Sequence, residues 1–176
     1  MDEDPKGTSY NIVPTLTAAQ AQELGYLVAW WAFLEHQVAV MGKDLLAISE
    51  EEGRAVFTQM NIRPRLQTIS LLLPSRAIYD RDVKRFAEFR TAIEEVQAKR
   101  NLVAHGLWSE DHDGGRFVLQ MWGGKDGVKR LEPEAHPMDD EKISQICGEI
   151  AMLAAEFTNW WGEASQRLMP STYRPW

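Results

Sequence analysis

The 176-residue chain has a single cysteine, Cys147, and no long apolar run. One cysteine excludes an intrachain disulfide and a cysteine-rich metal site. No apolar segment reaches the roughly 20 residues that a membrane-spanning helix needs. The N-terminus is acidic, and no apolar segment that could act as a signal peptide follows it. We therefore expect a cytoplasmic protein without a membrane span.

Several common enzyme signatures are also missing. The chain contains no P-loop, no dinucleotide-binding glycine pattern, no G-x-S-x-G and no H-E-x-x-H. These absences give no support to the enzyme classes that those motifs mark, and we expect no cofactor. The net charge of −7 argues against loose nucleic-acid binding through the whole surface.

Positive charge is nevertheless concentrated in residues 63–100. This segment carries five acidic and nine basic residues, which gives it a net charge of +4. The basic residues are Arg63, Arg65, Arg76, Arg81, Lys84, Arg85, Arg90, Lys99 and Arg100. A basic segment of this kind favours an anionic ligand, and it could line a cleft that receives an RNA backbone. The same residues could equally form the solvated faces of two helices.

Helical spacing dominates the rest of the pattern. Apolar residues recur every three or four positions, Thr17 and Gln20 fit a capping box, and Ser49 fits an N-cap. The predicted helices cover residues 17–48, 49–60, 64–75, 80–105 and 137–168. Trp30 and Trp160 each stand beside a second tryptophan, so that one member of each pair is available for a dimer surface.

A different pattern interrupts the helices at residues 106–135. Two glycine-rich turn sequences flank an apolar stretch at 116–122, with further strand candidates at 107–110 and 128–131. We expect a small β-hairpin or three-stranded flap there. The predicted fold is a single, mainly α domain over 1–176, an antiparallel bundle of four to five helices with this β-hairpin inserted before the last helix. Residues 1–15 are expected to form a loose arm and residues 169–176 a C-terminal tail.

The stretch from Lys99 to Trp108 combines reactive side chains with a predicted helix end. Asn101 and His105 are four residues apart and share one helix face, and Arg100 is in line with the apolar stripe. An inward guanidinium needs acceptors, and the candidates are Glu35, a partner subunit or a bound phosphate. Gly106 is expected to end the helix in the left-handed conformation.

This stretch resembles the R-N-x-x-x-H signature of the HEPN superfamily (higher eukaryotes and prokaryotes nucleotide-binding domains). Arg100, Asn101 and His105 match the signature residue by residue, and Ala104, Gly106 and Trp108 resemble the flanks of small bacterial members. The resemblance implies a helical bundle and, as in many members, a metal-independent ribonuclease. It also implies a homodimer in which two motifs face each other, and a role as a toxin or defence component with an antitoxin or other partner protein.

The residue types agree with cleavage of RNA by its own 2′-hydroxyl. His105 is the expected general acid and base, and its place at a helix C-terminus favours the imidazolium. Arg100 would hold phosphate oxygens, and Asn101 would orient His105 or the backbone. The alternative is a non-catalytic module for dimerisation, nucleotide binding or protein binding, with these three residues fixing the helix end.

A metal site is a weaker alternative for the same region. Asp111, His112 and Asp113 follow the motif closely and could join His105 around a metal ion. Turn formation explains these three residues without a metal, because Asp and Gly are typical of turns. We therefore expect no metal in the site.

Overall fold

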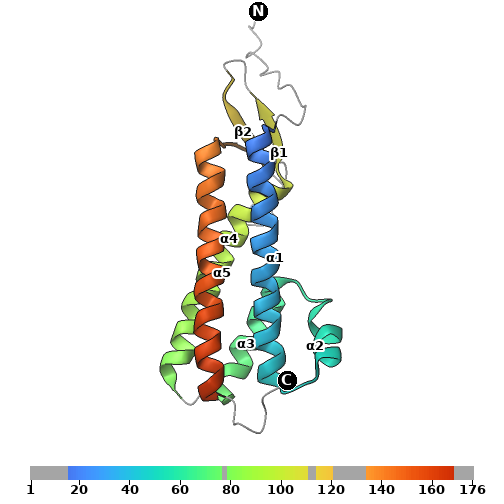
Figure 1. Cartoon of the computed structure of the whole chain (residues 1–176), viewed down its shortest axis with the longest axis vertical. Coiled ribbons are helices and arrows are strands. Elements are labelled where there is room, and N and C mark those ends of the chain that lie inside the picture. Colours follow the sequence, from blue (N-terminus) through green and yellow to red (C-terminus); the bar gives the residue numbers. More distant parts are fainter. Residues whose placement is uncertain (1–15, 77–78, 111–113, 121–133, 169–176) are drawn as a thin grey trace, which may run out of the picture.

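The computed structural model describes residues 16–76, 79–110, 114–120 and 134–168. This part of the chain forms five helices and one small sheet, which confirms the predicted helical bundle with a β insertion before its last helix (Figure 1). The elements are α1 Ala18–Leu46, α2 Glu50–Phe57, α3 Ile62–Arg76, α4 Asp80–His105, β1 Leu107–Glu110, β2 Arg116–Gln120, β3 Glu134–Pro137 and α5 Asp140–Leu168.

The long helices α1 and α5 run side by side and form the centre of the bundle (Figure 1). The start of α1 is fixed by the expected capping box, in which the Thr17 hydroxyl accepts from the Gln20 N–H at 3.0 Å and the Gln20 side chain accepts in return. The helix stops at Ala47, whose φ of 56° is left-handed. Ser49 caps α2 in the same reciprocal way with Glu52.

The core lies where α1, α3, α4 and α5 meet. The apolar series predicted for α4 is buried from Phe86 to Val103, and it packs against a similar series on α5. The Phe89 ring lies 5.3 Å from the rings of Phe157 and Trp160. Trp161 is buried, and Trp160 packs against the core while partly buried. The last helix therefore does not present the spare tryptophan that was expected for a dimer surface.

The end of α4 differs from the expected left-handed cap. Gly106 has φ −73° and ψ 158°, which is extended, and the chain passes directly from α4 into β1. A glycine is needed here because β2 approaches closely. A Cβ on Gly106 would overlap the Val118 side chain and would lie 2.5 Å from the carbonyl oxygen of Leu102. Close packing, and not a positive φ, therefore requires this glycine.

The inserted sheet is antiparallel in the order β1-β2-β3 and sits at one end of the bundle (Figure 1). Leu107 pairs with Leu119 across β1 and β2, and Val118 pairs with His136 across β2 and β3. Pro137 belongs to β3, so that α5 begins three residues later than predicted. The predicted strand at 128–131, the N-terminal arm and the C-terminal tail lie outside the described residues.

Other helix boundaries differ from prediction by a few residues, and two of these differences are at the ends of α2 and α3. Helix α2 ends at Phe57 and not at Met60. Helix α3 continues through Pro74 to Arg76. Proline near the end of a helix removes only one of the last backbone hydrogen bonds, so that the helix can continue for a few residues.

Candidate functional site

The three residues of the predicted motif meet at the last turn of α4. The Arg100 Nη1 donates to the Asn101 Oδ1 at 3.1 Å and lies 2.8 Å from the His105 Nε2. Asn101 and His105 are exposed, and Arg100 is half-buried. Asn101 and His105 share one helix face because they are four positions apart, and the long Arg100 side chain reaches both of them. The structure thus brings together all three predicted site residues.

Arg100 is held against the bundle by an aromatic ring. Its Cζ lies 5.9 Å from the centre of the Trp31 ring on α1, within range of a cation–π interaction. Its Nε is buried and has no hydrogen-bond partner among the described residues. Glu35, one of the three candidate acceptors, lines the same cleft but forms no ion pair with Arg100. The guanidinium therefore keeps donor capacity for a ligand.

The Arg100–His105 contact joins a guanidinium to a ring nitrogen. A guanidinium has only donors, so the His105 Nε2 is the acceptor in this contact. Asn101 contacts Arg100 and not His105, so its role is to orient the guanidinium.

Trp108 fixes the helix end that carries His105. Its indole Nε1 donates to the carbonyl oxygen of Val103 at 3.0 Å, inside the protein. This bond satisfies one of the last carbonyls of α4, which have no partner within the helix. The sequence marked Trp108 only as a flank of the motif. Its structural role depends on β1 folding back beside α4.

Two open clefts flank the cluster. The first has a volume of about 640 Å³ and extends from Trp31 and Glu35 past Arg100 to the start of α3. The second has a volume of about 810 Å³ and extends toward β1 and β2. Asn101, His105 and Arg63 line both clefts. Arg63 is exposed and has no ion pair within the described ranges, so that its guanidinium is available to an anion beside His105.

The position of Arg63 could not be identified from the sequence, where it was one of nine basic residues. The basic segment does not form one continuous surface. Only Arg63, Lys99 and Arg100 line the clefts beside the motif. Lys99 is paired with Glu149 at 2.6 Å, and Arg85 with Glu88 at 2.8 Å. The expectation that the whole segment lines the cleft was therefore wrong, because α4 distributes its cations along its full length.

No group of three or more His, Cys, Asp or Glu residues is arranged to hold a metal ion in the described part of the chain. The alternative metal site with Asp111, His112 and Asp113 lies outside that part. No described helix is long and apolar enough to cross a membrane.

The chain matches no protein-family model, no curated protein and no solved structure, so the HEPN resemblance depends on the motif and the helical layout alone.

Proposed function

We propose that the protein is a HEPN-like, metal-independent endoribonuclease whose catalytic residues are Arg100 and His105. One observation carries the proposal. A permanently charged guanidinium and an imidazole lie 2.8 Å apart at the junction of two open clefts. A side chain that moves protons next to a fixed cation matches the needs of phosphodiester cleavage.

The reaction begins when the RNA 2′-hydroxyl attacks the adjacent phosphorus. The His105 Nε2 takes the hydroxyl proton as the bond between the 2′-oxygen and phosphorus forms. The bond between phosphorus and the 5′-oxygen breaks, the leaving 5′-oxygen takes a proton from water, and His105 afterwards releases its extra proton to the solvent. The products are a 2′,3′-cyclic phosphate and a free 5′-hydroxyl. This transesterification needs no oxidant, cofactor or metal.

Arg100 has two successive roles in this scheme. Without RNA it donates to the His105 Nε2. When a phosphodiester enters, the guanidinium turns its donors to the phosphate oxygens and releases the Nε2 lone pair. Asn101 keeps the guanidinium in place through the 3.1 Å bond to its Oδ1. The Arg100 Nη2, which has no hydrogen-bond partner among the described residues, adds a further donor toward the anion.

The proposed assembly is a homodimer, in which two clusters combine into one site. Exposed aromatic side chains on α1 support it, because Tyr26, Trp30 and Phe33 recur at helical spacing on one face. Trp30 is adjacent to Trp31, so that this face lies at the same height on α1 as the Arg100 cluster. A partner protein such as an antitoxin remains part of the proposal through the HEPN resemblance.

A non-catalytic interaction module is the second candidate. The same contact between Arg100 and His105 favours this second candidate. The Arg100 guanidinium occupies the nitrogen that a general base would use. If this bond persists when RNA is present, the cluster fixes the helix end and the α1 face binds a partner.

Cleavage of RNA in the presence of EDTA tests the proposal. We expect the His105→Ala variant to lose about 10²–10⁴-fold in rate and the Arg100→Ala variant about 10²–10³-fold. The products should carry 2′,3′-cyclic phosphates, and a 2′-deoxy nucleotide at the cleaved position should block the reaction. Toxicity on expression should be relieved by the same substitutions.

The matched controls are Arg85→Ala, which removes a surface arginine of the same helix, and His136→Gln, which removes a histidine of β3. Both variants should cleave at the wild-type rate. Intact RNA with every folded preparation would favour the interaction module. Equal losses in the control variants would show that the activity belongs to a contaminant or depends on stability alone.

A further inference from the structure

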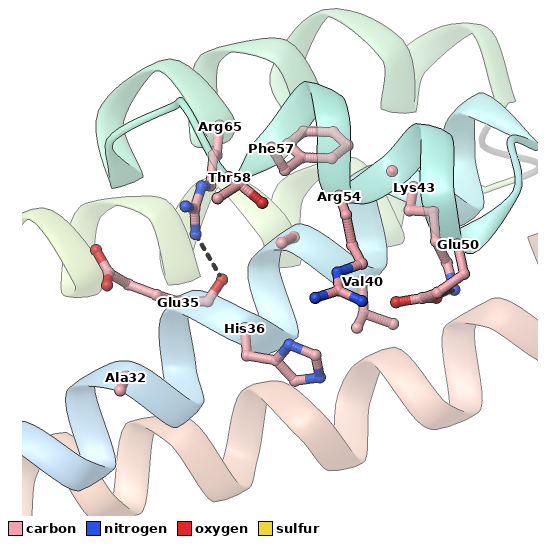
Figure 2. Close-up of a pocket in the computed structure, with 12 residues that line it drawn as sticks. Ala32, Glu35, His36, Val40, Lys43, Glu50, Arg54, Phe57, Thr58 and Arg65 are labelled. Atoms are coloured by element: carbon pink, nitrogen blue, oxygen red, sulfur yellow. Dashed lines mark hydrogen bonds and ion pairs between the residues drawn. The ribbon is translucent and has the colours of Figure 1, made fainter.

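A third cavity, separate from the Arg100 cluster, lies between α1, α2 and the start of α3 (Figure 2). Its volume is about 500 Å³, within the size range of small-molecule sites. Val40 and Phe57 supply apolar wall, and the polar side chains include His36, Arg54 and Arg65. His36 is exposed and lines this cavity.

The walls of the cavity are formed by close packing. Phe57 of α2 is buried against Gly42 of α1, where a Cβ would lie 2.8 Å from the Phe57 Cε1. A Cβ on Gly53 would lie 2.6 Å from the Cγ of Lys43. The two glycines therefore allow α2 to dock directly on α1. Because this docking is tight, the cavity is a preformed feature of the fold.

The cationic groups of the cavity are only partly compensated. Lys43 is paired with Glu50 at 2.9 Å, and this hydrogen bond keeps the pKa of the Glu50 carboxyl below its ordinary value. The Arg54 guanidinium forms no ion pair or hydrogen bond with another described residue. Its guanidinium reaches from α2 toward the side of α1 that carries His36 (Figure 2).

Arg65 provides a second guanidinium. Its Nη1 donates to the backbone oxygen of Glu35 at 3.0 Å, while its Nη2 has no hydrogen-bond partner among the described residues. The Glu35 carboxylate points away from Arg54 in Figure 2 and does not pair with either arginine. Two guanidinium groups and an imidazole thus share one cavity with the Glu50 carboxylate, which is paired with Lys43 and interacts with Arg54 and His36 only through longer-range electrostatics.

We propose that this cavity binds a small phosphate monoester. A guanidinium matches two phosphate oxygens with parallel donors, and Arg54 reaches toward His36, whose imidazole suits a further oxygen (Figure 2). A phosphate monoester has three free oxygens and up to two negative charges, whereas a carboxylate has two oxygens and one charge. Val40 and Phe57 provide an apolar wall for the organic part of the ligand.

Calorimetric titration of the full chain with phenyl phosphate tests this proposal, with benzoate and inorganic phosphate as comparisons. We expect saturable binding of one phenyl phosphate per chain, stronger than binding of either comparison. Arg54→Ala should weaken binding by about 10–100-fold, the effect of losing a hydrogen bond between charged groups. Arg54 is exposed and unpaired, so this variant should fold normally.

Arg85→Ala is the matched control and should bind phenyl phosphate as the wild type does. Arg100→Ala separates this cavity from the proposed nuclease site, because it should also leave the titration unchanged. Absence of saturable binding at millimolar ligand would overturn the proposal. So would equal binding by the Arg54→Ala variant, stronger binding of benzoate, or loss of binding in the Arg100→Ala variant.

Discussion

Replacement of Trp108 by phenylalanine would test how the end of α4 is held. The change keeps a buried aromatic ring but removes the indole N–H that donates to the Val103 carbonyl at 3.0 Å. A buried carbonyl that loses its partner costs about 1–3 kcal/mol. We therefore expect the free energy of unfolding to fall by about 2 kcal/mol. Urea denaturation followed by far-UV circular dichroism measures this change.

Trp161→Phe provides a matched control at another point of the bundle. Trp161 is also buried, and its Nε1 donates to the Asp44 Oδ2 at 3.3 Å. Both variants lose one indole hydrogen bond, so that both should be destabilised. Only Trp108→Phe should loosen the last turn of α4, where the Gly106 N–H donates to the Leu102 oxygen at 2.9 Å.

Hydrogen exchange at the Gly106 amide distinguishes the two effects. In Trp108→Phe, we expect its protection to fall further than the loss of global stability requires, because the helix end opens locally. In Trp161→Phe, its protection should fall no further than global stability does. Unchanged stability of Trp108→Phe, or equal behaviour of the Gly106 amide in both variants, would refute the account of this helix end.

Two further changes test the packing and the electrostatics of the bundle. Gly106→Ala should destabilise the protein by about 1–3 kcal/mol through overpacking. Adding Val118→Ala to Gly106→Ala should restore part of the lost stability, measured by thermal denaturation, because it removes the side chain that the new Cβ would overlap. If the stability losses of the two single variants simply added in the double variant, the close approach would be contradicted. Burial raises the pKa of Asp44 above 3.8, so its contribution to stability should fall as pH rises from 3.8 through the folded pKa. Asp44→Asn should remove that part of the pH dependence while still accepting from Trp161, and an identical pH profile for wild type and variant would contradict it.

The sequence was sufficient for the helical pattern because burial of one apolar face produces a regular spacing. The series from Phe86 to Val103 and the Thr17 capping box are local patterns, and both have the predicted structure. The contact between Arg100 and His105 was also accessible, since both side chains come from one helix end. These features depend on residues only a few positions apart.

Contacts between segments that are distant in the sequence could be identified only from the tertiary structure. Gly106 looked like a left-handed cap, but its role comes from β2, which packs against it. Arg63 could not be distinguished from other cations until α3 placed it beside His105. The cavity around Arg54 exists only because α2 docks on Gly42. Sequence spacing determines on which face of its own helix a residue lies. The packing of helices and strands against one another determines which distant residues contact that face.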